Sequence, residues 1–264
     1  MRVGIIGAGN MGEAIIKGLR AKRRFSVNFY DKDRAKKKKI EEQYCVKFFK
    51  LEELIKKCRI IIICVKPQDI DALLIDLRGG INQKHMVISI AAGVTTSYIQ
   101  KFFKSKIPVV RAMPNMPGMI GQGITACVLG KYSGKSTAKI TRLIFSSIGK
   151  TLEIKNESKM DAVTAVSGSG PGFMAYLTQA LKEAAVSVGL KEEEAEFLAV
   201  YVSSGTANML QNEQISPMDL VKRVASKGGT TEAGLKVFNK HKIKTIITDA
   251  VYAAAKRSKE LIKK

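Results

Sequence analysis

The stretch "RVGIIGAGNMG", Arg2 to Gly12, decides the fold of the first part of the chain. Its apolar start is typical of a buried parallel strand, and it runs into the spacing G-x-G-x-x-G, which opens a helical pattern. In this setting Gly7 permits a tight turn, Gly9 lets a pyrophosphate approach the backbone, and Gly12 allows the strand and the helix to pack closely. The helix N-terminus presents free N–H groups to an anion. The sequence therefore predicts a dinucleotide-binding turn.

Strands and helices alternate from this turn to about residue 155. Apolar runs predict strands at residues 2–7, 25–31, 59–65, 86–92, 107–113, 123–130 and 150–154. Helical patterns predict helices at residues 11–20, 32–43, 67–77, 96–103 and 137–147. This alternation indicates an α/β fold that starts with a doubly wound, dinucleotide-binding Rossmann domain over residues 1–155.

Strand patterns almost stop after Glu157. Period and propensity predict helices at residues 160–166, 173–190, 191–211, 217–225, 231–240 and 247–264. Several of these helices are apolar over much of their circumference, and a domain of about 100 residues has too little interior to bury them all. We therefore expect residues 156–264 to form an all-α substrate and dimerisation domain, which makes the protein a homodimer.

Composition narrows the class of protein. The chain has 264 residues, of which 45% are hydrophobic, so it can form a substantial core. Its net charge of +22 suits polyphosphates or small anions, but it has no zinc spacing, no RNA-binding signature and no interleaving of aromatic and basic residues. We expect no nucleic-acid partner. No apolar run reaches the ~20 residues of a membrane helix, and the first residues lack the features of a secretory signal, so we expect a cytoplasmic protein without a membrane partner.

The sequence gives little support for a metal site. The two histidines lie in polar, lysine-rich surroundings, where a histidine-based metal site is improbable. The four cysteines form no C-x-x-C pair, which favours free, buried thiols. These cysteines are Cys45, Cys58, Cys64 and Cys127.

The end of the second predicted strand bears on the choice of nucleotide. Asp31 lies 19 residues after Gly12, where a carboxylate accepts hydrogen bonds from a ribose 2′-hydroxyl and repels a 2′-phosphate. Lys32, Arg34 and the lysines at 36–39 favour a 2′-phosphate instead. We expect NADH to be preferred and NADPH to be usable.

Two further strand ends are expected at the cofactor, because ligands of such sheets lie beyond the carboxyl ends of the strands. These are "CVKPQ", residues 64–68, and "RAMPNMPGMIGQG", residues 111–123. Asn115 stands between two prolines, where it either bonds the nicotinamide or substrate or is only a turn residue. The expected cofactor-binding residues are Gly7, Gly9, Asn10, Met11, Gly12, Asp31, Val65, Lys66, Pro67, Met113, Pro114 and Asn115.

The chain resembles the pyrroline-5-carboxylate reductase family over nearly its whole length. The resemblance rests on "VGIIGAGNMGEAI", "CVKPQ", "SIAAGV", "RAMPNMP", "DAVTAVSGSGPGFMAYL" and "VASKGGTTEAGL". It implies NADH- or NADPH-dependent reduction of the cyclic imine Δ1-pyrroline-5-carboxylate to L-proline, the last step of proline biosynthesis. It also implies helical domains that interlock into dimers, which assemble further in many members.

The stretch "VASKGGTTEAGL", Val224 to Leu235, combines two glycines with hydroxyl residues at a predicted helix start. Such a start can bind a carboxylate, although the residues alone favour a helix cap. The resemblance implies a substrate loop there, and Thr231 is our candidate for the hydrogen bond to the ring nitrogen. "SGSGPGF", residues 167–173, is expected beside the nicotinamide and the substrate, or is only a helix-breaking turn. The expected substrate-binding residues are Ser169, Ser226, Gly229, Thr230 and Thr231.

These motifs contain no convincing general acid. An imine substrate would explain this absence. Its nitrogen binds already protonated, so the protein mainly positions the imine carbon against the nicotinamide. A β-hydroxyacid-type dehydrogenase would need a lysine or histidine acid near the hydride. A non-catalytic nucleotide-binding protein or a basic nucleic-acid-binding protein is a further alternative.

The chain departs from the family pattern at two places. Lys227 stands where the family loop commonly has the proline of "SPGGTT", so a restraint on φ is lost and a cation is added. Gly172 and Phe173 replace the usual alanine and tyrosine of "SGSGPAY", so a phenol is lost. Neither change removes a backbone donor, and we expect the reaction to be unchanged.

Overall fold

The computed structural model describes residues 1–261. Within them, one eight-stranded sheet has the strand order β3-β2-β1-β4-β5-β6-β7-β8. All neighbouring strands are parallel except β6 and β7, which pair antiparallel. The strands are β1 (Arg2–Ile6), β2 (Ser26–Tyr30), β3 (Lys47–Phe48), β4 (Ile60–Ile63), β5 (Met86–Ser89), β6 (Val109–Met113), β7 (Gly123–Leu129) and β8 (Gly149–Glu153).

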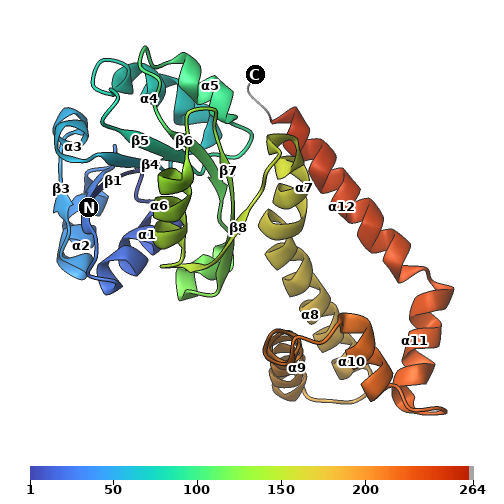
Figure 1. The fold of residues 1–264 in the computed structure, drawn as a ribbon. Coiled ribbons are helices and arrows are strands. Elements are labelled where there is room, and N and C mark those ends of the chain that lie inside the picture. Colours follow the sequence, from blue (N-terminus) through green and yellow to red (C-terminus); the bar gives the residue numbers. More distant parts are fainter. Residues whose placement is uncertain (262–264) are drawn as a thin grey trace. The chain divides into compact units, whose positions relative to one another are not determined.

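Helices cover both faces of this sheet, as Figure 1 shows. One buried cluster joins the sheet to α1, α2 and α6, and a second joins it to α3, α4 and α5. Strand β4 is buried at all four positions, as expected for a strand that is covered on both sides. The helices are α1 (Asn10–Ala21), α2 (Ala35–Tyr44), α3 (Leu51–Lys57), α4 (Ile70–Leu77), α5 (Thr96–Lys101) and α6 (Lys135–Phe145), with short turns η1 (Pro67–Asp69) and η2 (Met116–Ile120).

The doubly wound sheet predicted from the sequence is present. The seven predicted strands and five predicted helices all occur. The structure adds β3 and α3, which the sequence analysis did not assign. Strand order reverses at β1, whose neighbours are β2 and β4, so the crevice for a ligand is expected at the carboxyl ends of these three strands.

After β8 the described chain is helical. Its elements are η3 (Glu157–Lys159), α7 (Met160–Val163), the π-helical turn η4 (Thr164–Gly168), α8 (Gly170–Ser187), α9 (Glu192–Glu213), α10 (Pro217–Val224), α11 (Thr230–Lys240) and α12 (Ile243–Glu260). The helix predicted at 247–264 corresponds to α12, and its residues 262–264 lie outside the described residues.

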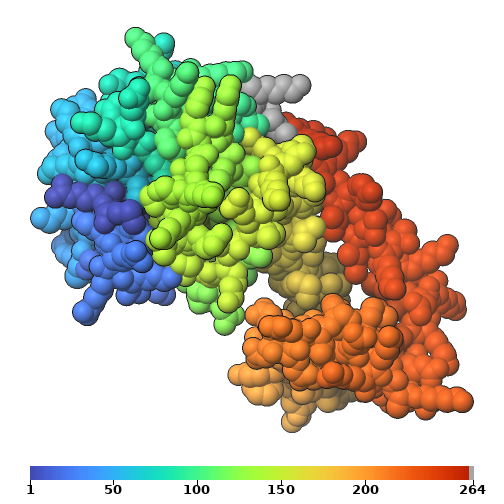
Figure 2. Space-filling model, viewed as in Figure 1, coloured from blue at the N-terminus to red at the C-terminus, as the bar shows by residue number. Residues whose placement is uncertain are grey.

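The chain divides into two compact units. One contains Met1–Ser169 together with the end of α12 from Ala254 onward, and the other contains Gly170–Ala253. Within the second unit few side chains are buried, Ala195 and Ala199 of α9 among them. Large apolar side chains of α8 and α9 are exposed instead. Figure 2 shows atoms of this unit, coloured from ochre to red, on the visible face. These exposed side chains include Met174, Tyr176, Leu181, Phe197, Leu198 and Tyr201.

The cysteines are free in the structure, as expected from their spacing. Cys58 and Cys127 are buried and Cys64 is partly buried, but Cys45 is exposed, so the expectation of a buried thiol is wrong for Cys45. Cys45 ends α2 in the left-handed conformation, with a φ of 51°. Among residues 1–261, no helix is long and apolar enough to cross a membrane.

Candidate functional site

The glycine-rich turn between β1 and α1 fits a dinucleotide. Gly7 has a φ of +97°, which favours glycine, and its N–H donates to the carbonyl of Tyr30 at 2.8 Å. A Cβ added to Gly7 would lie 2.9 Å from the carbonyl carbon of Cys64, and one added to Gly12 would overlap the Gly7 carbonyl oxygen. A Cβ on Gly9 would instead meet nothing within 4 Å. The backbone at Gly9 is therefore open to a ligand.

Helix α1 begins directly at this opening with Asn10 and Met11. Gly9 caps the helix and supplies no side-chain acceptor, and the first helical bond runs from the Glu13 N–H to the Gly9 carbonyl at 2.8 Å. The earlier N–H groups of the first turn have no helical partner, so they remain available to an anion.

Asp31 bonds the end of β2 to the glycine-rich turn. Its Oδ2 atom accepts a hydrogen bond from the Ala8 N–H at 2.6 Å, and its Oδ1 atom accepts one from the Asp33 N–H at 2.8 Å. The Lys36 Nζ lies 3.6 Å from Oδ2. The carboxylate therefore helps to shape the turn.

A cavity of about 330 Å³ lies at the carboxyl ends of β1, β2 and β4, where the strand order reverses. It brings together five of the expected cofactor residues from three separate segments of the chain. These five are Gly7, Gly9, Asp31, Val65 and Lys66. Pro67 follows them as the first residue of η1, whose next two residues also line the cavity.

A second cavity, of about 680 Å³, adjoins the first along Tyr30, Asp31 and Lys32. Four cationic side chains line it, against two carboxylates. The cations are Lys32, Arg34, Lys37 and Lys50, and the carboxylates are Asp31 and Glu52. This cavity has the charge required by an anionic group that extends from the first cavity.

Strand β6 carries the remaining expected cofactor residues. Met113 ends the strand and packs against the buried cluster of Ala126, Val128 and Met160. Pro114 is buried. The Oδ1 atom of Asn115 accepts a hydrogen bond from the Ile124 N–H at 2.9 Å. The side-chain carbonyl of Asn115 therefore has a structural role, because it bonds the start of β7. None of the three lines either of the two cavities.

The stretch "SGSGPGF" begins in the π-helical turn η4, a geometry often found at functional sites. The Ser169 N–H donates to the Thr164 carbonyl at 3.0 Å. A Cβ on Gly168 would lie 2.9 Å from the Met113 Cε, so this turn adjoins the end of β6. The Ser167 hydroxyl is buried and has no hydrogen-bond partner among the described residues.

The predicted substrate loop lies between α10 and α11. The N–H of Gly229 donates to the Ser226 carbonyl at 3.0 Å, and the N–H of Gly228 donates to the Glu232 Oε2 at 2.5 Å. Both glycine donors are therefore engaged, one within the loop and the other with the first turn of α11. Among the described residues, the donors left without a partner include the Lys227 N–H, the first N–H groups of α11 and the hydroxyls of Ser226, Thr230 and Thr231.

Comparison with known proteins places this arrangement in a family. Residues 157–261 match the family model described as pyrroline-5-carboxylate reductase dimerisation, and residues 2–93 match the one described as NADP oxidoreductase coenzyme F420-dependent. A pyrroline-5-carboxylate reductase of Synechocystis sp. is 37% identical, with 100% of this chain and 99% of that protein covered. The chain belongs to the pyrroline-5-carboxylate reductase family. The family predicted from the sequence motifs is thereby confirmed.

Solved structures of the family have the same fold. The pyrroline-5-carboxylate reductase of Coxiella burnetii has a TM-score of 0.95 at 30% identity, with 99% of this chain and 98% of that chain covered. The Plasmodium falciparum enzyme with NADP bound has a TM-score of 0.86 at 27% identity, with 100% and 98% covered. The predicted fold class, a Rossmann domain followed by a helical region, is confirmed.

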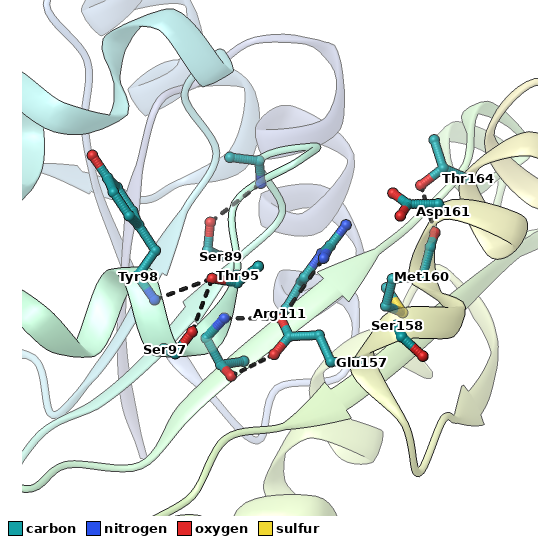
Figure 3. A network of polar contacts seen from close by, with 12 residues as sticks. Ser89, Thr95, Ser97, Tyr98, Arg111, Glu157, Ser158, Met160, Asp161 and Thr164 are labelled. Atoms are coloured by element: carbon teal, nitrogen blue, oxygen red, sulfur yellow. Dashed lines mark hydrogen bonds and ion pairs between the residues drawn. The ribbon is translucent and has the colours of Figure 1, made fainter. Parts of the chain in front are cut away.

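A buried polar network around Arg111 and Glu157 was not predicted from the sequence (Figure 3). Arg111 of β6 is 3% exposed, and its Nη1 atom lies 3.7 Å from the Glu157 Oε1. Glu157 also accepts hydrogen bonds from the N–H and the hydroxyl of Thr96, at 2.8 and 2.7 Å. Burial lowers the pKa of Arg111, and the charges of Glu157 and Asp161 oppose that shift.

This network joins four segments of the first unit. The Ser258 hydroxyl, on the end of α12, donates to the buried Asp161 carboxylate at 2.8 Å. One sequence signal could have indicated the network. Arg111 is a lone cation inside the apolar strand pattern "IPVVRAM", and a buried cation requires a carboxylate partner.

Proposed function

We propose that this chain reduces the cyclic imine Δ1-pyrroline-5-carboxylate to L-proline with NADH or NADPH, the last step of proline biosynthesis. The observation that carries this function is full-length membership of the pyrroline-5-carboxylate reductase family. The cavity at the switch point of the sheet, lined by the glycine-rich turn and Asp31, agrees with it. The chain is an NAD(P)H-dependent oxidoreductase, as the sequence motifs predict.

We assign the cofactor to the first cavity and its surroundings. The N–H groups at the start of α1 and the open backbone at Gly9 suit a pyrophosphate, and Asp31 suits the adenosine ribose. When bound there, the reduced nicotinamide supplies a hydride. We propose as cofactor-binding residues Gly7, Gly9, Asn10, Met11, Gly12, Asp31, Val65, Lys66, Pro67, Met113, Pro114 and Asn115.

The substrate carboxylate is assigned to the start of α11. Its free N–H groups and hydroxyls can make charge-assisted hydrogen bonds, which are stronger than bonds between neutral groups. We propose as substrate-binding residues Ser169, Ser226, Gly229, Thr230 and Thr231, although the Gly229 N–H is bonded to Ser226 in the present conformation.

The catalytic task of the protein is mainly positional. The iminium carbon accepts the hydride, and the electron pair of the C=N double bond moves to the nitrogen, which gives the amine of proline. We propose Thr231 as the residue that hydrogen-bonds this nitrogen. Because the imine binds already protonated, the site needs no strong general acid.

The assembly and location proposed here follow the sequence expectations. Residues 1–155 form the nucleotide-binding domain, and residues 156–264 form the substrate and dimerisation domain. The exposed apolar faces of α8 and α9 support a homodimer or a higher homo-oligomer. We propose that the protein is cytoplasmic and has no nucleic-acid partner.

One assay tests the proposed reaction. Oxidation of NADH and of NADPH is followed at 340 nm with Δ1-pyrroline-5-carboxylate as the substrate. In a separate assay, reduction of NAD and of NADP is followed with 2-hydroxy and 3-hydroxy acids. We expect turnover with the imine and none with the hydroxy acids. Turnover only with a hydroxy acid would favour the β-hydroxyacid-type dehydrogenase, and no turnover with any substrate would favour a binding protein.

A further inference from the structure

We propose that Glu232 is a positioning residue for the substrate loop, residues 226–231. Its carboxylate bonds the turn at Gly228 and so holds the donors at the start of α11 where a substrate carboxylate can reach them. This inference rests on the proposed function and deepens it. The Glu232 carboxylate cannot donate a hydrogen bond to the substrate carboxylate, so its role is to hold the groups that can.

The contacts of Glu232 engage both carboxylate oxygens. Oε2 accepts the hydrogen bond from the Gly228 N–H at 2.5 Å, and Oε1 lies 3.2 Å from the Lys236 Nζ, one turn further along α11. The bond from Gly228, and then that from Lys236, lower the pKa of Glu232. The carboxylate is therefore ionised at neutral pH and bonds the loop as an anion.

The loop has few other restraints on its shape. Gly228 has a φ of +74°, which glycine adopts easily, but glycine also adopts many other conformations and so does not restrict the backbone. Lys227 stands where a proline would restrict φ, and the Lys227 N–H donates no hydrogen bond among the described residues. The hydrogen bond between Gly228 and Glu232 therefore restricts the conformation of the loop, which the residue types of the loop do not.

This division of donors has a consequence for substrate binding. The N–H groups of Gly228 and Gly229 stabilise the loop, through Glu232 and the Ser226 carbonyl. The N–H groups at the start of α11 are left for the substrate. If the Glu232 bond is lost, the turn samples other conformations, and binding must then overcome the entropy cost of ordering it.

Three single variants test the role in the full-length enzyme. Glu232→Ala removes the acceptor, and Glu232→Gln keeps an oxygen that can accept the Gly228 N–H. Lys236→Ala removes the ion pair alone. We expect the KM for Δ1-pyrroline-5-carboxylate to rise about tenfold in Glu232→Ala, less in Glu232→Gln, and little in Lys236→Ala. The KM for NADPH should stay within about twofold of the wild type in all three.

A double variant gives a second readout. Lys227→Pro restricts the backbone without adding a donor, so it should restore much of the lost affinity for the imine in the Glu232→Ala background. If the double variant is as impaired as Glu232→Ala alone, loop shape is not the cause and the inference is overturned. A lower KM for the imine in Glu232→Ala would also overturn it, because Glu232 would then compete with the substrate.

Amide hydrogen exchange separates this inference from the proposed reaction. We expect the Gly228 amide to exchange at least about tenfold faster in Glu232→Ala than in the wild type or in Lys236→Ala. If the wild type reduces no pyrroline-5-carboxylate, the proposed function fails while exchange still reports on the loop. Unchanged exchange at Gly228 would refute the restraint whatever the enzyme turns over.

Discussion

The Oδ2 atom of Asp31 accepts a hydrogen bond from the N–H of Ala8 at 2.6 Å, which joins the end of β2 to the turn after β1. The carboxylate therefore has two possible effects on the cofactor. Its charge would oppose a 2′-phosphate, and its hydrogen bond orders the turn that we propose binds the pyrophosphate. Substitutions that separate charge from hydrogen bonding can measure each effect.

We predict that removal of the Asp31 charge shifts preference from NADH towards NADPH. Asp31→Asn keeps an oxygen for the Ala8 N–H, whereas Asp31→Ser is too short to keep it. Both variants should raise the ratio of kcat/KM for NADPH to that for NADH about tenfold, as expected when a repulsion of about 1–2 kcal/mol is removed. Asp31→Ser should also raise the KM for both nucleotides.

The cofactor preference of the wild-type enzyme can contradict this prediction. A strong preference for NADPH before any substitution would show that the cations of the second cavity, Lys32, Arg34, Lys37 and Lys50, outweigh Asp31. In that case Arg34→Ala, and not a change at Asp31, should be the substitution that alters the preference.

We predict an obligate dimer built from the helical domain. Phe197 and Tyr201 of α9 are 61% and 62% exposed, and their rings lie 4.4 Å apart between centroids. Phe197→Glu would bury a charge in the apolar interface, which costs at least about 3 kcal/mol, or about two orders of magnitude in Kd. Sedimentation velocity at micromolar concentration should show a dimer for the wild type and a shift to monomer for this variant.

A polar position on the same helix gives the control. Glu193→Lys changes charge by a greater amount but lies in the charged first turn of α9, so the dimer should persist. A monomeric wild type at micromolar concentration would contradict the interface argument, because the apolar side chains of α8 and α9 would then be stable in water.

The sequence predicts the centre of the sheet well because its strands there are continuous apolar runs, such as the four isoleucines of β4. It does not predict β3, which has two residues and carries a lysine, or α3, which lies in a lysine-rich stretch. The antiparallel pairing of β6 and β7 was also not assigned. A signal exists there, since residues 114–122 are too few for a helical crossover between parallel strands.

Motifs in the sequence identify the segments of the site but not the partners of individual donors. The turn at residues 7–12 is predictable because Gly7 and Gly12 have steric reasons within the fold, and Gly9 leaves the backbone open to a ligand. Glu232 is different, because its bond to Gly228 depends on the path of the loop into α11. The network of Arg111 and Glu157 likewise joins residues distant in sequence, which no local pattern specifies.

We predict that one thiol reacts much faster than the others. Cys45 is exposed, whereas burial raises the pKa of Cys58 and Cys64 and raises that of Cys127 to about 12. Because the thiolate is the reactive form, Cys45 should react with a disulfide reagent at pH 8 at least on the order of tenfold faster. A Cys45→Ser variant should lose the fast phase, and guanidinium should expose the remaining thiols. A fast phase that survives in Cys45→Ser would contradict the burial of Cys58 and Cys127 and the partial burial of Cys64.

The hydroxyl and the N–H of Thr231 have no partner among the described residues. If it bonds the substrate, Thr231→Ala should lower kcat/KM for pyrroline-5-carboxylate by about one to two decades, the size of a lost hydrogen bond to a charged group at ~1.5–3 kcal/mol. Nucleotide affinity should stay nearly intact.

Lys227→Ala is the matched control in the same loop. Lys227 is exposed, so a contribution of its charge should be below about 1 kcal/mol and should weaken further with added salt. The order of the two effects decides the assignment. A larger loss in Lys227→Ala would make the lysine a direct ligand of the substrate carboxylate. If Thr231→Ala instead lowers the free energy of unfolding and leaves the kinetics of the folded enzyme unchanged, the threonines only cap α11, because a cap stabilises the helix without contacting the substrate.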